Sequence, residues 1–192
     1  MKANKKERFF EVSLQLIHEK GFKATTMRNI ADALDFKVAN VYNYIDNKQS
    51  LLEIFLFDIS AEFHHRIDHI IASSYTPKEK LRALISYHVQ LPAEKPYHIG
   101  LLVNEWRNLK GEKLEQFLAE RNAYEQKVQS IIKEGIDAGE LRKMNLEVAT
   151  FSILSSVRWL FSWYTSSETT INPIELEKQL VDFIFEGIRY KV

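Results

Sequence analysis

The stretch GFKATTMRNIADALDFKVANVYNYIDNKQSLL, residues 21–52, decides how this chain folds. It opens on a glycine, a residue that commonly follows the end of a helix. Thr25 or Thr26 can cap the helix that comes next, and Asn47 can cap another. Between these caps lies a polar segment, residues 37–45, with no glycine or proline inside it. The stretch therefore predicts two short helices and the start of a longer one.

Hydrophobic periodicity extends the helical pattern on both sides of this stretch. Apolar residues at helical spacing predict a first helix over residues 5–20, and those after Lys48 predict a fourth helix reaching about Ser73. The third helix is expected over residues 37–44, after a turn at Asp35. Further helices are expected near 77–90, 96–110, 112–138, 145–165 and 173–190, with prolines 92, 96 and 173 at breaks or starts. No alternating strand pattern appears, so the predicted fold class is all-α.

Composition narrows the classes of protein to which the chain can belong. Its 192 residues are 45% hydrophobic, which is enough for a sizeable core. The absence of cysteine excludes disulfides, thiol catalysis and Cys-based zinc sites, and it fits a reducing, cytoplasmic setting. The apolar stretch 148–164 contains Arg158 and four serines, and a membrane span needs about 20 largely uncharged residues. We therefore expect no membrane association.

The charges are unevenly distributed along the chain, although the formal net charge is zero. Residues 1–50 hold nine Lys or Arg against six Asp or Glu, a net charge of +3. The remaining residues hold 17 against 20, a net charge of −3. A basic N-terminal segment permits a polyanionic partner.

Three short helices followed by a long one are typical of a helix-turn-helix unit. In such a unit the second helix crosses the phosphate backbone of DNA and the third enters the major groove. Carboxamides can pair with base edges, while tyrosine hydroxyls and lysine ammonium groups can reach phosphates. The alternative is that the two tyrosines only pack and the asparagines only meet solvent. We expect DNA contacts from Thr26, Arg28, Lys37, Val38, Asn40, Tyr42, Asn43, Tyr44 and Lys48.

The spacing of these residues resembles the DNA-binding signature of TetR/AcrR-type transcriptional regulators. The matching positions, over about residues 2–62, are Gly21, Thr25–Thr26, Ile30–Ala31, Tyr42, Tyr44–Ile45, Lys48 and Leu51–Leu52. Two departures are Asp35, where the family usually has glycine, and Lys37, where it has a small capping residue. An Asp can adopt a positive φ, but losing the hydroxyl at Lys37 weakens the start of the third helix unless Asp35 caps it.

The resemblance implies how the chain is organised and what it does. It implies a DNA-binding domain over residues 2–62, called the head, with its motif at about 25–44. It also implies a regulatory and dimerisation domain over 63–192, called the body. A homodimer would bind a palindromic operator on double-stranded DNA, as a repressor released by a small ligand. No enzymatic activity and no cofactor are implied. The alternatives are a small ligand-binding protein or enzyme that has kept the head without operator binding, and a helical adaptor for a partner protein.

The last two long helices are apolar beyond a single stripe. Such helices need partners on several sides, and two from each of two chains would bury each other. The resemblance implies the same dimer contact, whereas the alternative is burial within one chain. The expected dimer contacts are Leu154, Phe161, Leu180, Phe183 and Ile184.

Two aromatic stretches with arginines, residues 105–111 and 157–164, are suited to lining an apolar pocket. Together with residues 134–142 they loosely resemble a subgroup that senses acyl-coenzyme A thioesters. We expect the pocket in the body, between the lower part of the fourth helix and the helices that carry Trp106, Tyr124 and Trp159. The expected ligand is an acyl-CoA or a fatty acid, with a planar aromatic compound as the alternative. Its expected lining is Phe63, Ile67, Glu105, Trp106, Arg107, Arg121, Tyr124, Arg158 and Trp159. The alternative is that these aromatic residues are ordinary core or interface residues.

Three histidines lie in HHRIDHI, residues 64–70. His65 and His69 stand four residues apart on one helix face, where two imidazoles can bind a metal, but two ligands do not make a site. We expect these histidines and His64 to form a solvated face or the mouth of a pocket, without a metal.

Overall fold

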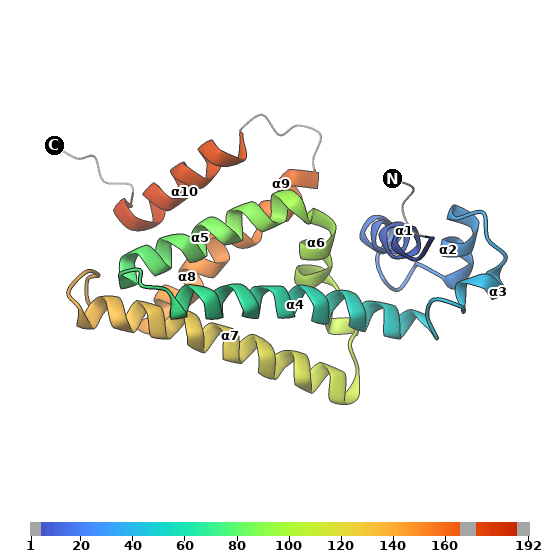
Figure 1. Ribbon diagram of the computed structural model, residues 1–192, viewed down its shortest axis with the longest axis horizontal. Helices are drawn as coiled ribbons and strands as arrows, with labels where there is room; N and C mark the ends of the chain where they lie inside the picture. Colours follow the sequence, from blue (N-terminus) through green and yellow to red (C-terminus); the bar gives the residue numbers. More distant parts are fainter. Residues whose placement is uncertain (1–4, 166–171, 188–192) are drawn as a thin grey trace. The chain divides into compact units, whose positions relative to one another are not determined.

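The computed structural model describes residues 5–165 and 172–187, so the ends of the expected domains at 2–4 and 188–192, and residues 166–171, lie outside the described residues. In the described part every regular element is a helix, which confirms the all-α fold (Figure 1). The elements are α1 (Lys5–Lys20), α2 (Met27–Ala33), α3 (Val38–Val41), α4 (Lys48–Ala72), α5 (Pro77–Glu94), α6 (Pro96–Asn104), the 3₁₀ helix η1 (Trp106–Asn108), α7 (Gly111–Asp137), α8 (Leu146–Arg158), α9 (Leu160–Thr165) and α10 (Pro173–Glu186). None of the helices described here has the length and apolar character needed to cross a membrane.

The chain forms two compact units. The first contains Met1–Ala61 and Tyr97–Leu118, and the second contains Glu62–Pro96 and Ala119–Val192. Helices α4 and α7 contribute residues to both units. The first unit is thus the expected head together with α6, η1 and the start of α7.

Local sequence sets the ends of the first helices. Gly21 follows α1 with a φ of 81°, a conformation that glycine adopts without strain. The Thr26 hydroxyl accepts a hydrogen bond from the Asn29 amide at 3.1 Å, and Asn29 Oδ1 accepts one from the Thr26 amide at 3.0 Å. This capping box starts α2. Asn47 caps α4 in the expected way, by accepting a hydrogen bond from the Ser50 amide at 2.9 Å.

The core of the first unit collects apolar side chains from α1, α2, α3, α4 and α6. Phe9, Ile30, Val41, Leu51 and Leu52 are completely buried in it. Each helix of the head buries one face there, which stabilises helices too short to persist in isolation. The α3 helix is therefore held by packing rather than by its own length.

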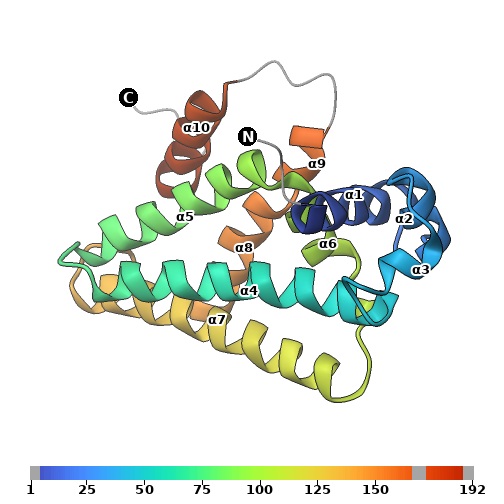
Figure 2. The ribbon, with the colours of Figure 1, turned by 45° about the vertical axis from the view of Figure 1, so that its right-hand side comes forward.

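The second unit is organised around α5. This helix contacts α8, α9 and α10, and α10 runs beside it in both views (Figures 1 and 2). The buried core includes Leu84, Ile85 and Val89 from α5 and Val128, Ile131 and Ile132 from α7.

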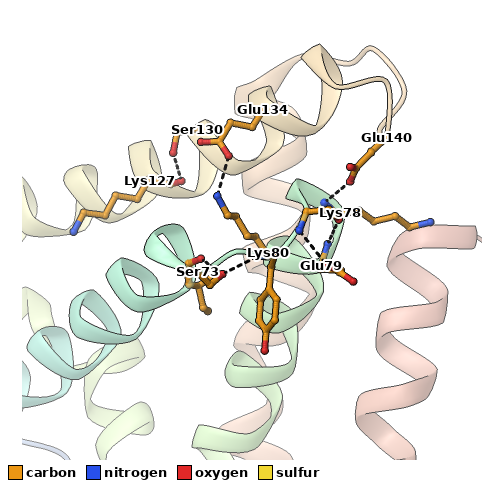
Figure 3. A network of polar contacts seen from close by, with 11 residues as sticks. Ser73, Lys78, Glu79, Lys80, Lys127, Ser130, Glu134 and Glu140 are labelled. Atoms are coloured by element: carbon orange, nitrogen blue, oxygen red, sulfur yellow. Dashed lines mark hydrogen bonds and ion pairs between the residues drawn. The ribbon is translucent and has the colours of Figure 1, made fainter.

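Polar contacts fix the start of α5 (Figure 3). Lys80 Nζ lies 3.3 Å from Glu134 Oε2 on α7, and the Lys78 amide donates to Glu140 Oε2 at 2.9 Å. Thr76 and Glu79 form a second capping box at this end. The start of α5 is thereby tied to the end of α7 and to the loop after it.

Several expected helices differ in extent from the observed ones. The third covers only Val38–Val41, and the segment expected over 96–110 divides into α6 and η1. The helix expected over 145–165 breaks at Trp159, whose Nε1 donates to the Ser156 carbonyl at 2.6 Å. That carbonyl is the one that a continuous helix would offer to residue 160. Pro92, expected at a break, lies inside α5, which continues to Glu94.

Candidate nucleic-acid interface and body cavity

The α3 helix and the turn after it present polar side chains outward. Val41 is completely buried, whereas Tyr42 is 52% exposed and Asn40 and Asn43 are exposed. Tyr44 turns the other way, because its ring stacks on Phe9 with 5.1 Å between the ring centres. One of the two expected tyrosines therefore packs in the head while the other is free to meet a partner.

Six of the nine expected DNA contacts are exposed, and α2 and α3 pack against each other. The exposed residues are Thr26, Arg28, Lys37, Asn40, Tyr42 and Asn43. Val38 is half-buried against the core of the head. Thr26 uses its hydroxyl in the capping box, so the backbone start of α2 is already ordered.

The start of α3 has the features expected from its sequence. Asp35 has a φ of 56°, in the left-handed region that the family's glycine would occupy. Lys37 is the N-cap residue of α3 and makes no side-chain capping bond, and Asp35 does not replace it. The N-terminus of α3 thus has no side-chain cap.

Lys48 is directed into the head, which differs from the expected contact with phosphate. Its ammonium group donates to the carbonyls of Phe22 and Thr25, at 2.6 Å each, and to that of Lys23 at 3.3 Å. It also lies 4.5 Å from the centre of the Phe22 ring. Burial lowers the pKa of Lys48, and the nearby Glu105 carboxylate partly offsets this effect. The geometry makes Lys48 a clamp on the loop between α1 and α2.

Glu105, Trp106 and Arg107 belong to the first unit, although they were expected to line a ligand pocket in the body. The Glu105 carboxylate accepts hydrogen bonds from the Phe22 amide at 3.2 Å and from Asn108 Nδ2 at 2.7 Å. Trp106 stacks on Phe117, and the Arg107 guanidinium lies 4.5 Å from the Trp106 ring centre. Glu105 therefore supports the same loop that Lys48 clamps.

In the second unit the structure brings the expected residues Phe63 and Tyr124 together. Their ring centres are 5.8 Å apart, and His88 completes the cluster with its Nε2 at 2.8 Å from Tyr124 Oη. Burial lowers the pKa of His88 to about 4 and raises that of Tyr124. Sequence reasoning missed His88, yet its spacing from Leu84 and Leu91 places it on the apolar side of α5.

The histidines of α4 have two different environments. His64 Nε2 lies 3.0 Å from the Glu120 carbonyl oxygen, and Lys127 lies between His64 Nδ1 and Asp68. His65 and His69 are exposed, with their Nε2 atoms 3.1 Å apart. Within residues 5–165 and 172–187, no group of three metal-binding side chains comes together.

The remaining expected pocket residues are dispersed. Ile67 is completely buried in the core, Arg121 is paired with Glu125 at 3.8 Å, and Arg158 is exposed. Trp159 is 42% exposed and stacks on Trp163. Their role in ligand binding stays a prediction.

A cavity of about 680 Å³ lies in the second unit, among α5, α7, α8 and α10. Leu81, Ile132 and Ile153 supply apolar lining, Lys78 and Arg142 supply two positive charges, and Glu140 supplies one negative charge. None of the nine residues expected to bind a ligand lines it. In the sequence, no feature of the end of α7 or of the loop to α8 predicts a pocket, apart from the loose resemblance at 134–142.

Helices α8 and α10 carry an exposed apolar surface. Of the expected dimer contacts, Phe183 is 53% exposed, and Leu154, Phe161, Leu180 and Ile184 are half-buried. Val148, Phe151 and Ile174 are also exposed, at 63%, 72% and 78%. Val148 and Phe151 lie on α8, which was expected to need partners on several sides, and in the single chain they meet solvent.

Comparison with known proteins agrees with this architecture. Residues 9–54 match the model described as "Bacterial regulatory proteins, tetR family", and residues 74–188 match "Tetracyclin repressor-like, C-terminal domain". The HTH-type transcriptional repressor KstR2 of Rhodococcus jostii is 22% identical over 97% of this chain and 92% of its own. The fatty acid metabolism regulator protein of Bacillus subtilis is 21% identical over 99% and 98%.

A solved structure shows the same fold. The crystal structure of AibR in complex with isovaleryl coenzyme A and operator DNA superposes with a TM-score of 0.83, at 22% identity, over 95% of this chain and 98% of that one. Because the C-terminal match alone spans more than half of the 192 residues, this chain belongs to the tetR family of bacterial regulatory proteins, which are DNA-binding transcriptional regulators and not enzymes.

Proposed function

We propose that the protein is a homodimeric repressor that binds a palindromic operator through α2 and α3 and leaves it when a small hydrophobic ligand binds the body. The observation that supports operator binding is the exposure of Asn40, Tyr42 and Asn43 around a helix whose Val41 is completely buried. The buried Val41 holds these polar side chains at the surface, where they can replace hydrogen bonds to water by hydrogen bonds to base edges. The proposed DNA-binding domain is residues 2–62, and the regulatory domain is 63–192.

Within this surface, the chemistry of each side chain suggests its role. Asn40 and Asn43 can pair bidentately with adenine in the major groove. Arg28, Lys37 and Tyr42 can bind phosphates, which fix the register of the head without reading sequence. Lys48 acts differently, since its ammonium group already binds three carbonyls.

The dimer proposal rests on where the exposed apolar side chains lie. Among the described residues, seven large hydrophobic side chains are exposed, and five of them lie at α8 or α10, namely Val148, Phe151, Trp159, Ile174 and Phe183. A concentration of this kind marks an interaction surface. A two-fold contact between two copies would cover it, and would place two heads on half-sites about one DNA turn apart.

The ligand proposal rests on the body cavity. Its volume, about 680 Å³, lies within the range of small-molecule sites. The lining has apolar side chains and two cations, Lys78 and Arg142, against one carboxylate, Glu140, whose Oε2 already accepts a hydrogen bond from the Lys78 amide. It suits a molecule that has both a hydrocarbon part and an anionic group. An acyl-CoA or a fatty acid has this character, and the similar AibR structure contains isovaleryl coenzyme A.

The experiment that tests operator binding is selection of bound sequences from random duplex DNA. The expected result is a palindromic sequence. Asn40→Ala should reduce the preference for the selected base at particular positions, by about 1–3 kcal/mol each. Gln15→Ala, an exposed carboxamide on α1, is the matched control and should leave the selected sequence unchanged. If no sequence is enriched, the operator proposal fails and the ligand-binding alternative takes its place.

The ligand is tested by release from the selected operator. A panel of acyl-CoA esters, fatty acids and cationic dyes should give release by one of the first two classes. Arg142→Gln should raise the ligand concentration needed, whereas Lys143→Gln, an exposed neighbour that does not line the cavity, should not. Equal effects of the two variants would contradict the assignment of the cavity.

A further inference from the structure

The first unit contains a hollow of about 400 Å³ that is separate from the α3 surface. It is formed by the end of α1 and the loop after it, and by the end of α6 together with η1. We call it the cationic hollow because Lys20, Lys23 and Arg107 are among its lining residues.

None of these three cations forms an ion pair within the described residues. Lys20, Lys23 and Arg107 are exposed. The acidic side chain in the lining is Glu105. Its carboxylate is already engaged by the Phe22 amide at 3.2 Å and by Asn108 Nδ2 at 2.7 Å. The hollow therefore keeps an excess of positive charge.

The hollow also has an ordered floor. Phe22 is 7% exposed, its amide is held by Glu105, and its carbonyl accepts a hydrogen bond from Lys48 at 2.6 Å. Arg107 lies over the Trp106 ring at 4.5 Å, which restricts the guanidinium. A restrained guanidinium beside two lysines suits a doubly charged oxyanion, because arginine can bind it with two parallel hydrogen bonds.

We propose that the cationic hollow binds a small phosphate-bearing anion. Arg107 would pair bidentately with phosphate oxygens, and Lys20 and Lys23 would add their charges. The carboxamides of Asn104 and Asn108 line the same hollow and can bind the uncharged part of the ligand. The site is distinct from the operator surface and from the body cavity, so it adds a second ligand to the proposed function.

The structure offers a local reporter for this binding. The chain has three tryptophans, and Trp106 lies directly under Arg107. Replacing Trp159 and Trp163 by phenylalanine leaves Trp106 as the single indole. Inorganic pyrophosphate is then titrated at constant ionic strength while Trp106 fluorescence is recorded. A saturable change is expected.

Variants separate a specific site from general attraction. Arg107→Gln should weaken pyrophosphate binding at least tenfold, and Lys23→Gln should weaken it as well. Lys113→Gln removes the same charge from an exposed position of the first unit outside the hollow, and should bind like the parent. Thermal melts establish that each variant is folded, and Lys23→Gln serves if Arg107→Gln is not.

The source of the phosphate is resolved by three parallel titrations, with pyrophosphate, adenosine diphosphate and a short non-specific duplex. Binding of the two small anions, lost in Arg107→Gln, supports the proposal. Three results would each overturn the proposal. The first is an equal fluorescence response to sodium chloride, and the second is equal anion binding by Arg107→Gln and Lys113→Gln. The third is an effect of Arg107→Gln on duplex binding alone. Operator selection by the parent protein is independent of all three outcomes.

Discussion

Lys48→Met separates two roles that a lysine at the start of α4 can play. A lysine in this position can neutralise a phosphate, or it can hold the head in shape. The observed ammonium group donates to Phe22 and Thr25 at 2.6 Å and is directed into the head. We predict that Lys48→Met weakens operator binding without changing the salt dependence of that binding.

The magnitude follows from counterion release. Each phosphate contact contributes about 0.9 to the slope of log K against log salt, so two contacts in a dimer contribute about 1.8. If Lys48 bound phosphate, the ratio of wild-type to variant affinity would shrink about 12-fold between 50 and 200 mM salt. If it clamps the loop, the ratio stays constant.

The clamp also predicts a loss of stability. Hydrogen bonds to a charged group contribute about 1.5–3 kcal/mol each, but water can reach these carbonyls once the half-exposed ammonium group is removed. We therefore expect the free energy of unfolding to fall by about 2 kcal/mol. A urea titration measures this loss.

The assay is fluorescence anisotropy of a labelled operator across the salt series, well below the unfolding midpoint of each variant. Lys37→Met is the matched control, because Lys37 is exposed and makes no capping bond. Its affinity ratio should shrink with salt by the amount calculated for a phosphate contact. If Lys48→Met follows the same salt curve as Lys37→Met, the clamp reasoning is refuted.

Three further predictions test the turn, the dimer and the buried histidine. Asp35→Gly should raise the free energy of unfolding by about 0.5–1 kcal/mol in urea, because Asp35 has a φ of 56° and glycine removes the clash of its Cβ. Phe151→Glu should give a monomer by light scattering that loses operator binding, while Glu147→Gln, an exposed change on the same helix, should stay dimeric. His88 has a pKa of about 4 in the folded chain against an ordinary 6.5, so the unfolded chain binds more protons and stability falls as the pH drops below 6.5. Between pH 7.5 and 5 this removes about 2 kcal/mol, and His88→Gln should abolish that part of the loss at fixed protein concentration.

Local signals in the sequence predicted the elements whose ends depend on nearby residues. Gly21 ends α1, Thr26 starts α2 and Asn47 caps α4, each through contacts within a few residues. The positive φ of Asp35 was predictable for the same reason, because the turn fixes it locally. Periodicity likewise located the long helices, since each buries one continuous face.

Contacts between distant residues could not be predicted in this way. Tyr44 and Tyr42 are alike in the sequence, and the ring of Phe9, 35 positions before Tyr44, decides which of them packs inward. The carboxylate of Glu105 is satisfied by the amide of Phe22, 83 residues away. The stretch 105–111, with its tryptophan and its arginine, therefore suggested a pocket, whereas its Glu105 supports a loop of the head.

The clamp and the Glu105 contacts have a common consequence for regulation. Lys48 begins α4, and Gln49 beside it donates to the Asn108 carbonyl at 3.1 Å. Lys48 and Glu105 meet at Phe22, so the start of α4, the loop before α2 and η1 form one hydrogen-bonded group within the first unit. A displacement of α4 by a ligand in the body must therefore either carry the α2 loop with it or break these bonds. Because short charge-assisted bonds are costly to break, movement of the whole group is favoured. In the proposed ligand-released dimer, movement of this group would be sufficient for release, since two heads bind only while they keep the spacing of the half-sites.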